Sequence, residues 1–411
     1  MAEQHEKALV PQIRFTGFTD PWEQRKLGDI LQERNVRTSD FESNPIFSLT
    51  IEDGITPKTD RYERTSLITK TEDLFKIVSP NEFVTNPMNL RFGAFGYNKN
   101  SFSVCVSGYY DVFSIDNDKC SGFWNSYFKT SVALKRFDDA ATGSLIEKRR
   151  VKYSTLCQLI FLMPKGMDEK KRIGAFFDRL DSLITLHQRK YDKLCVLKKS
   201  MLDKMFPKGG SLYPEIRFAG FTDPWEQRKL GELFVIGGSG GTPSATNASY
   251  YGGDIPFLGI SDIKNRDITI TAKSITEKGL ENSAAWIIPA GSICLAMYAS
   301  VGKAGINRVS LATSQAFYNM VFEDETLRDF IYTRLEKADT DNEWNPLIST
   351  GTQANLNADK VKSFRILLPS SDERRLIAKY FADLDSLITL HQRKLELLRN
   401  IKKSMLDKMF V

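Results

Sequence analysis

The segment LDSLITLHQRK occupies Leu180–Lys190 and is repeated without change at Leu384–Lys394. A second block, PQIRFTGFTDPWEQRKL at Pro11–Leu27, returns with two substitutions as PEIRFAGFTDPWEQRKL at Pro214–Leu230. The copies lie 204 and 203 residues apart in these two blocks, so both belong to one duplication. Two copies are too few for a solenoid, whose stacked core needs about three or more units. The repeat therefore indicates two equivalent halves.

The segments between the repeated blocks, Asn35–Ile160 and Ile236–Ile366, show no clear similarity to each other. Ordinary divergence after a duplication would alter both copies along their whole length. Here the repeated blocks are nearly identical while the inserts differ, which is typical of a fixed frame that carries two exchangeable heads.

The repeated block at the end of each half predicts a long helix. Apolar positions recur at steps of four and three, as in a coiled-coil seam, with polar residues at two places in each copy. Asp168 and Asp372 are predicted to cap these helices, and Pro207 to end the first. About 34 residues would extend roughly 50 Å. The predicted helix-pair interface consists of Ile173, Phe177, Leu180, Ile184, His187 and Leu194 in the first copy, and Ile377, Phe381, Leu384, Ile388, His391 and Leu398 in the second.

The connection between the halves fixes the direction of packing. The first helix leads through a short linker into the second half, so a second helix that packs along it must run back. The predicted fold is α+β: two globular mixed α/β domains separated by an antiparallel pair of long coiled-coil helices, with pseudo-two-fold symmetry. The predicted domains are 11–166 and 214–370, each followed by a helix, at 167–207 and 371–411.

The two seam histidines, His187 and His391, occupy equivalent positions and are expected to approach each other. The usual role of such a residue is a packed, hydrogen-bonded core group. The alternative is a pH-sensitive pair that loosens on protonation near an unperturbed pKa of about 6.5.

Composition bears on the charge of a partner, on membrane insertion and on the state of the cysteines. The chain has 57 basic and 51 acidic side chains, a net charge of +6 that permits a polyanionic partner without requiring one. No apolar run reaches the ~20 residues that span a bilayer, so we expect a cytoplasmic protein. The five cysteines show no metal-binding spacing and are expected to be reduced core thiols.

Motifs for catalysis are missing from the sequence. Gly302–Lys303 lacks the upstream glycine of a phosphate-binding loop, and Gly237–Gly241 leads into Thr242 and Pro243 rather than a helix. There are only three histidines, which disfavours histidine-dependent nucleophiles and metal sites. Any catalysis is expected to come from a partner, although a self-sufficient nuclease or methylase and a scaffold that binds two proteins remain alternatives.

Several motifs of both halves resemble one known family, the specificity (S) subunits of type I restriction-modification systems. In the second half these are GGTPSATNASYYGGDIPFLGISDI at Gly240–Ile263, ITEKGLENSAAWIIPAGSICLAMYASVGKAGIN at Ile275–Asn307 and LATSQAFYNM at Leu311–Met320. In the first half, DGITPKTDRYE at Asp53–Glu63, EFVTNPMNLRFGAFGY at Glu82–Tyr97 and VSGYYDVF at Val106–Phe113 are similar to a different recognition-domain type of the same family.

The resemblance implies a non-catalytic subunit that binds double-stranded DNA. Each target-recognition domain would read one half of a bipartite site, and the helices would set the gap and dock two methyltransferase (M) subunits. Restriction/translocase (R) subunits would join for cleavage. S-adenosylmethionine, ATP and Mg would belong to those partner subunits, with no cofactor or metal in this chain.

Residues for DNA contact must supply phosphate contacts for position and base-edge contacts for sequence. For any single candidate, a solvated-surface or core role is the alternative, and the Gly237–Gly241 run is either a flexible loop or a backbone nest for phosphate. The candidates are Lys58, Arg61, Arg64, Arg91, Tyr97, Asn98, Lys99, Arg149 and Arg150 in the first head, and Thr242, Ser244, Lys264, Arg266, Tyr298, Ser300, Lys303 and Gln315 in the second.

Overall fold

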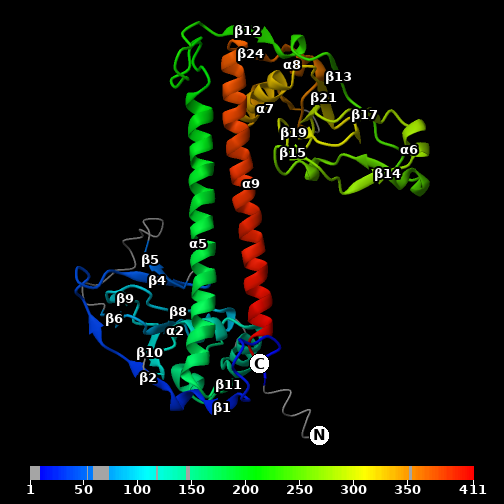
Figure 1. Cartoon of the computed structure of the whole chain (residues 1–411). Helices are drawn as coiled ribbons and strands as arrows, with labels where there is room; N and C mark the ends of the chain where they lie inside the picture. Colours follow the sequence, from blue (N-terminus) through cyan, green and yellow to red (C-terminus); the bar gives the residue numbers. More distant parts are fainter. Residues whose placement is uncertain (1–9, 53, 59–73, 117–118, 145–148, 351–353) are drawn as a thin grey trace. The chain divides into compact units, whose positions relative to one another are not determined.

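The computed structural model describes residues 10–52, 54–58, 74–116, 119–144, 149–350 and 354–411. The chain divides into two compact units: unit 1 is Met1–His187 with Lys394–Val411, and unit 2 is Gln188–Arg393. Each unit holds one sheet-rich head and part of both long helices (Figure 1). The units therefore divide inside the helices, whereas the sequence predicts boundaries between head and helix.

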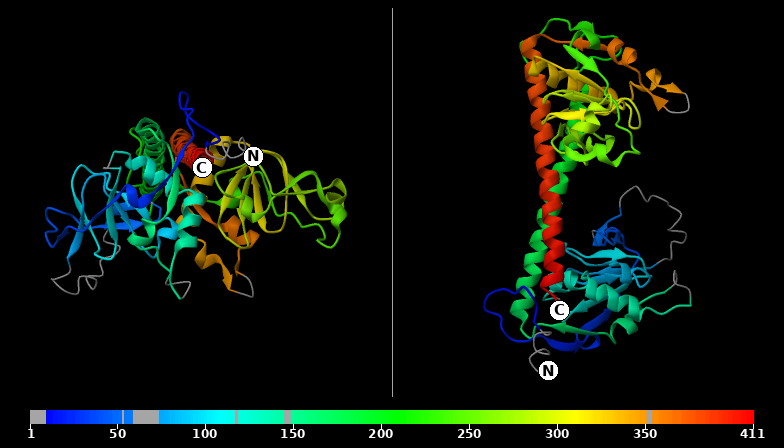
Figure 2. Two further views of the ribbon diagram at one scale, coloured as in Figure 1. Left: turned by 90° about the horizontal axis from the view of Figure 1, so that it is seen from below. Right: turned by 90° about the vertical axis from the view of Figure 1, so that its right-hand side faces the viewer.

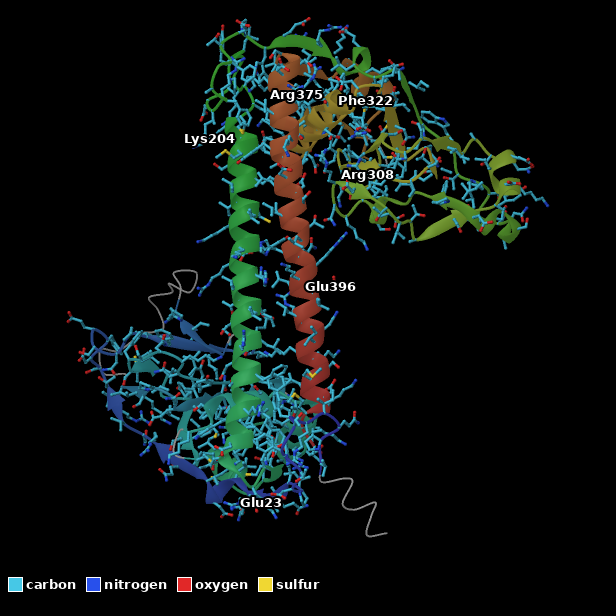
Figure 3. The ribbon with its side chains drawn as sticks, in the orientation of Figure 1. Glu23, Lys204, Arg308, Phe322, Arg375 and Glu396 are labelled. Atoms are coloured by element: carbon cyan, nitrogen blue, oxygen red, sulfur yellow. The ribbon has the colours of Figure 1, made fainter. Side chains whose placement is uncertain are left out.

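Two helices of 38 residues each correspond to the repeated blocks, α5 (Met167–Lys204) and α9 (Ser371–Lys408). Figure 3 labels Lys204 at the end of α5. The predicted caps are wrong, because Asp168 and Asp372 lie inside the first turns. In α9, Ser370 Oγ instead accepts a hydrogen bond from the backbone N–H of Glu373 at 3.4 Å. An acidic residue in the first turn still interacts favourably with the helix dipole.

Within each unit the start of one helix meets the end of the other. In unit 1 the ring of Phe177 lies 5.7 Å from that of Phe410, which follows α9. In unit 2 the duplicates of these residues make the same contact, with Phe381 6.2 Å from Phe206. The helices thus run antiparallel within each unit, as the connection between the halves predicts.

The head of unit 1 is built on short antiparallel strands. A four-stranded sheet has the order β2-β10-β7-β8, a three-stranded sheet β3-β6-β9, and β4 pairs with β5. The strands are β2 (Leu31–Arg34), β3 (Arg37–Thr38), β4 (Phe47–Thr50), β5 (Gly54–Pro57), β6 (Phe75–Val78), β7 (Phe83–Thr85), β8 (Phe95–Tyr97), β9 (Val104–Val106) and β10 (Asp111–Ile115). The helices are α2 (Ser121–Tyr127), α3 (Ser131–Ala140) and α4 (Tyr153–Leu156).

The head of unit 2 has a different topology. Its five-stranded sheet has the order β13-β21-β18-β19-β15, its four-stranded sheet the order β16-β14-β20-β17, and β22 pairs with β23. The strands are β13 (Ile236–Gly238), β14 (Tyr251–Phe257), β15 (Asp267–Ile268), β16 (Lys273–Ile275), β17 (Trp286–Ile288), β18 (Ile293–Ala296), β19 (Ala304–Asn307), β20 (Leu311–Thr313), β21 (Phe317–Val321), β22 (Ser349–Thr350) and β23 (Ala354–Asn355). The helices are α6 (Glu277–Glu281), α7 (Glu325–Thr340) and α8 (Ala358–Ser363).

One head helix in each unit packs on the long helices. In unit 2, Phe330 and Leu335 of α7 share a core cluster with Phe381 of α9, and α7 lies beside α9 in Figure 1 and Figure 2. In unit 1, α2 crosses α5 at a pair of glycines, where a Cβ on Gly174 would lie 2.6 Å from the backbone nitrogen of Phe123. Because glycine has no side chain, the backbones of α2 and α5 can approach each other closely at this crossing.

The repeated blocks form the same frame around both heads. In unit 1, β1 (Glu23–Lys26) pairs antiparallel with β11 (Ile160–Met163), the strand before α5. In unit 2, β12 (Glu226–Lys229) pairs in the same register with β24 (Arg365–Leu368), the strand before α9. Figure 3 labels Glu23, the first residue of β1. Each head is thus closed at its base by a strand pair whose first strand has the sequence EQRK.

A buried ion pair fastens each frame to the start of a long helix. The guanidinium of Arg14 donates to both carboxylate oxygens of Glu169, at 2.7 and 2.8 Å, and Arg217 makes the same two bonds with Glu373. Bidentate pairs of this kind add geometric specificity as well as energy. The end of the other helix is held too, because Ile13 N–H donates to the carbonyl of Lys408 at 2.9 Å.

Two composition-based expectations concern thiols and membranes. Cys105, Cys120 and Cys294 are buried, Cys157 and Cys195 are half-buried, and all five are free thiols. Burial raises the pKa of Cys105 to about 11, so its thiol stays protonated at neutral pH. Among the described residues, no helix combines the length and the apolar character needed to cross a bilayer.

Candidate nucleic-acid interface

A group of exposed polar side chains gathers on the head of unit 2. Thr242 Oγ1 donates to the Oε1 atom of Gln315 at 2.9 Å, and the hydroxyls of Ser244 and Thr246 are 2.8 Å apart. The carboxamide of Gln315 is therefore held in one place, and its NH2 group has no partner among the described residues. A fixed exposed amide is one of the groups that bond base edges in a DNA groove.

The glycine run beside this group is packed rather than loose. A Cβ on Gly240 would lie 1.9 Å from the carbonyl oxygen of Thr313, and one on Gly241 would lie 2.7 Å from the Cβ of Ala284. None of the glycines in Gly237–Gly241 has a positive φ. The run is therefore neither a flexible loop nor a nest, since a nest alternates right- and left-handed backbone. Its glycines let the segment lie against neighbouring backbone.

Arg266, by contrast, holds the head together. Its side chain is buried, its Nη2 atom lies 3.0 Å from Asp329 Oδ1, and its guanidinium lies 4.9 Å from the ring centre of Tyr332. A second carboxylate, that of Asp385 on α9, is 3.8 Å away. With these partners, Arg266 is a positioning residue between head and helix, and we do not propose it as a DNA contact.

The remaining candidates of the second head differ in exposure. Tyr298 is half-buried against the core, and its backbone bridges to Asn355. Ser300 is exposed in a turn with φ of 60°, next to Ala299 at 40°. Such left-handed values are uncommon for residues other than glycine and mark a specialised loop. Lys264 is exposed and Lys303 is half-buried, and both line one cavity of unit 2.

The sequence did not predict a duplicated interhelical ion pair. Lys198 Nζ on α5 lies 2.5 Å from Asp385 on α9, and it also pairs with Glu336 on α7. In unit 1 the duplicates make the same contact, since Lys402 Nζ lies 2.5 Å from Asp181. The sequence does contain an indication of this ion pair, because a lysine interrupts the apolar positions of the seam at the same place in both copies. Burial raises the pKa of Glu336, and the charge of Lys198 opposes this shift.

Three consecutive candidates of the first head fix β8 to its surroundings. Tyr97 Oη and Lys99 Nζ both bond Asp178 of α5 at 3.0 Å. Burial, and then the nearby charge of Asp178, raise the pKa of Tyr97, which keeps its hydroxyl a donor. Asn98 is buried and donates to the carbonyls of Val78 and Phe102. Lys99 is the only one of the three whose side chain is about half-exposed.

The arginines of the first head divide into two groups. Arg91 pairs with Asp138 at 3.0 Å, and Arg149 donates to the backbone carbonyls of Asp138 and Ala141 at the end of α3. These two support the local fold. Lys58 is half-buried and Arg150 exposed, so both can meet a ligand. Arg61 and Arg64 lie outside the described residues.

The predicted helix-interface residues lie mostly in the head cores. Ile173, Phe177 and Leu180 share the unit 1 core with Leu398 packed against it. In unit 2, Ile377, Phe381 and Leu384 share the core, with Leu194 packed against it. The same residues thus bury against a head and against the opposite helix. Ile184, His187, Ile388 and His391 are half-buried. The two histidines fall in different units, so their approach stays a prediction.

Clusters of metal-ligating side chains do not occur in the part of the chain that the structure describes, where no three His, Cys, Asp or Glu residues form a group suited to a metal ion.

These features define a class of protein: α+β chains in which two unlike heads share one duplicated helical frame. Comparison with known proteins gives a match in the second half. Residues 222–400 match the model of the type I restriction modification DNA specificity domain. The resemblance to S subunits inferred from the sequence is confirmed.

Individual relatives agree with this assignment. The chain is 30% identical over 191 residues to the type I restriction enzyme MjaIX specificity subunit of Methanocaldococcus jannaschii, covering 46% of this chain and 44% of that protein. It is 32% identical over 150 residues to the HindI specificity subunit of Haemophilus influenzae, covering 36% and 32%. The matched regions thus span less than half the length of these relatives.

A solved structure agrees with the fold over nearly the whole chain. The S subunit of a type I restriction-modification system from M. genitalium superposes with a TM-score of 0.62 at 14% identity, covering 98% of this chain and 99% of that one. The predicted fold class, two sheet-rich domains joined by a pair of long helices, is confirmed.

Proposed function

We propose that this chain is the DNA sequence-specificity subunit of a type I restriction-modification complex. The observation that carries the proposal is the frame: the same strand pair and the same buried ion pair hold two heads of unlike topology. A frame of this kind presents two different readers in equivalent settings. Each head would read one half of a bipartite DNA site, and the helices would set the gap between the halves.

Methyl transfer and cleavage are assigned to partner subunits. Two methyltransferase subunits would dock on the duplicated helices, and restriction/translocase subunits would join them, bringing S-adenosylmethionine, ATP and Mg. In this division of labour the chain supplies no catalytic residue. Its contribution is binding, with phosphate contacts for position and base contacts for sequence. The residues that we propose for these contacts are Lys58, Lys99, Arg150, Thr242, Ser244, Lys264, Ser300, Lys303 and Gln315.

Exchange of a head tests the two-reader proposal. The chain is co-expressed with its methyltransferase subunits in a host that lacks DNA methylation, and modified bases are mapped across the genome by single-molecule sequencing. We expect a split motif with a fixed gap. Replacement of Asn35–Ile160 by the corresponding segment of another specificity subunit is expected to change one half of the motif only, and replacement of Ile236–Ile366 only the other. A continuous motif, or none despite a stable complex, would favour a protein-binding scaffold.

Exposed leucines on the helices supply the docking surface for the methyltransferase. Leu183 and Leu186 of α5 are exposed in unit 1, and their duplicates Leu387 and Leu390 of α9 are exposed in unit 2. Burying a leucine contributes about 1.5–3 kcal/mol. Changing all four to Ser is therefore expected to weaken methyltransferase binding about a hundredfold or more, since 1.4 kcal/mol is about tenfold.

Analytical ultracentrifugation of the co-expressed subunits measures this binding. The control changes Val196 and Leu397, which are also exposed helix residues but are not duplicated as apolar residues, to Gln. We expect this control to keep the complex intact. Equal weakening by both variants would show that the loss is not specific to the leucine pairs.

A further inference from the structure

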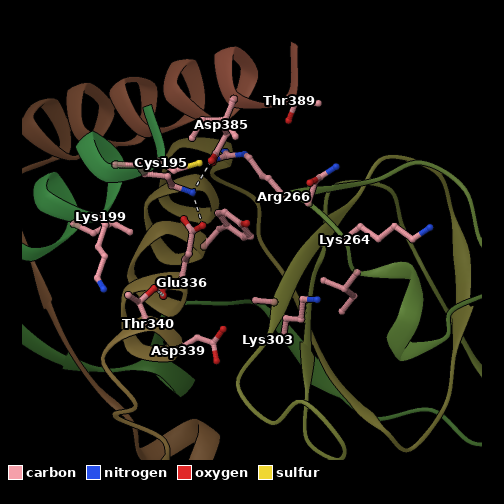
Figure 4. A pocket seen from close by; sticks show the side chains of 17 residues that line it. Cys195, Lys199, Lys264, Arg266, Lys303, Glu336, Asp339, Thr340, Asp385 and Thr389 are labelled. Atoms are coloured by element: carbon pink, nitrogen blue, oxygen red, sulfur yellow. Dashed lines mark hydrogen bonds and ion pairs between the residues drawn. The ribbon is translucent and has the colours of Figure 1, made fainter. Parts of the chain in front are cut away.

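A cavity of about 380 Å³ lies between the head and the long helices of unit 2 (Figure 4). Lys199 lines it from α5, and Lys264 and Lys303 line it from the head. The acidic residues Glu336 and Asp385 form the inner wall with Arg266. The volume is too small for a base pair with its backbone, so DNA can contact this cavity only at its rim, while ordered water can fill the interior.

The two cations of the inner wall are paired with carboxylates. Lys198 pairs with Glu336 and Asp385, and Arg266 with Asp329. In the described part of the chain, no carboxylate lies within ion-pair distance of Lys199, Lys264 or Lys303. The one other acidic side chain of the lining is Asp339; burial raises its pKa, and the field of Lys303 opposes the shift. The outer part of the cavity therefore carries a surplus of positive charge.

Several buried polar atoms of the inner wall lack a hydrogen bond, and ordered water rather than DNA can satisfy them. The Nη1 and Nη2 atoms of Arg266 are buried, and neither makes a well-aligned hydrogen bond within the described residues, although Nη2 is 3.0 Å from Asp329. Asp385 Oδ2 and Glu336 Oε2 also lack a hydrogen bond there, and an ordered water molecule can supply one to each. Buried N–H groups of this kind are costly unless they gain an acceptor.

We infer that the rim of this cavity binds the DNA backbone, with Lys199, Lys264 and Lys303 each contacting a phosphate group. The inference rests on the proposed function and deepens it, because it assigns the three lysines to backbone positioning rather than to base reading. Lysine ammonium groups act as point charges without the fixed geometry of arginine, which suits a contact that does not depend on sequence. Since Lys199 belongs to α5, the contact fixes the DNA to the helix as well as to the head of unit 2.

The triple variant Lys199→Gln, Lys264→Gln, Lys303→Gln tests the site in the full chain bound to its methyltransferase subunits. Fluorescence anisotropy gives the affinity for a cognate and a scrambled duplex over a range of salt concentrations. Each lost phosphate contact lowers the salt dependence of log K by about 0.9, so the slope is expected to fall by about 2 to 3. Both duplexes are expected to weaken by the same factor, about tenfold or more, with the methylated motif unchanged.

A single-residue pair provides the matched control. Lys403 is the duplicate of Lys199 on α9 and does not line this cavity. Lys199→Gln is expected to lower the salt slope by about 0.9, and Lys403→Gln to leave it unchanged at equal loss of charge. An equal decrease of the salt slope in both variants would show that net charge alone causes the effect, and it would overturn the proposed site. Hydrogen exchange of both variants checks that the fold is retained.

Other outcomes are equally distinct. An unchanged slope in the triple variant overturns the inference while leaving the proposed function intact, and so does a changed methylation motif, which would make these lysines base readers. A thermal midpoint that inorganic phosphate raises in the wild type but not in the triple variant, with DNA affinity equal in both, assigns the cavity to a free anion instead. If the wild-type complex retains no DNA, the proposed function fails together with the site.

Discussion

Replacement of Arg217 by Met is expected to lower the free energy of unfolding of unit 2 by about 3–5 kcal/mol. Glu373 is fully buried, and its carboxylate receives two hydrogen bonds from this guanidinium, at 2.7 and 2.8 Å. Without Arg217 the carboxylate remains in the interior with no compensating charge. The attachment of the repeated block to the start of α9 depends on this contact, so the base of the head should open first.

The double variant Arg217→Met/Glu373→Met separates the pair from its surroundings. Removing both charges eliminates the unpaired buried carboxylate, so most of the lost stability is expected to return. Hydrogen exchange measured by mass spectrometry, followed in peptides of β12 and the first turns of α9, reports on unit 2 alone. Arg14→Met should produce the same result in unit 1, where Glu169 is also buried. An equal loss of stability in the single and double variants would show that lost packing, and not the unpaired buried charge, causes the destabilisation.

The sequence predicts the helical frame well because the frame is repeated. Two copies of LDSLITLHQRK carry the same apolar spacing, and the chain connection leaves one direction for their packing. Local periodicity of this kind depends on neighbouring residues and is visible without a structure. The prediction of the helix starts at Asp168 and Asp372 failed by a small margin. An aspartate near a helix start is favourable both as a cap and inside the first turn, so the sequence alone does not separate the two positions.

The candidate DNA contacts were harder to predict, because basic residues look alike in sequence whether they are paired or free. Arg266 and Lys264 are two residues apart, yet the first is buried against Asp329 and the second is exposed. Asn98 likewise donates to the backbone carbonyl of Val78, which lies on β6. Such partners are brought together only by the tertiary fold. The packing of the glycine run at Gly237–Gly241 was hard to predict for the same reason, since the backbone that it contacts comes from segments distant in the sequence.

Replacement of Lys198 by Met is expected to destabilise unit 2 by about 3 kcal/mol near pH 8, and by less as the pH falls. Lys198 is the shared partner of Glu336 and Asp385, and its removal leaves two carboxylates side by side in a largely buried setting. Burial already raises the pKa of Glu336 above its ordinary value. A carboxyl group whose pKa is raised in the folded state binds a proton more readily there than in the unfolded chain, so folding is favoured as the pH drops.

The pH dependence distinguishes this network from simple packing. In the variant, the pKa of Glu336 loses the opposing effect of Lys198 and rises further, so stability should recover progressively as the pH falls toward the ordinary pKa of a glutamate. Thermal unfolding of the full chain at a series of pH values, with hydrogen exchange to identify unit 2, measures the effect. Lys402→Met is the matched control at the duplicate position. Its partner Asp181 also lies 3.9 Å from Lys99 and is more exposed than Asp385, so we expect a loss of about 1 kcal/mol with little dependence on pH. A loss at Lys198 that is the same at every pH would mean that Glu336 does not take up the proton, and that the lysine contributes through its aliphatic stem alone.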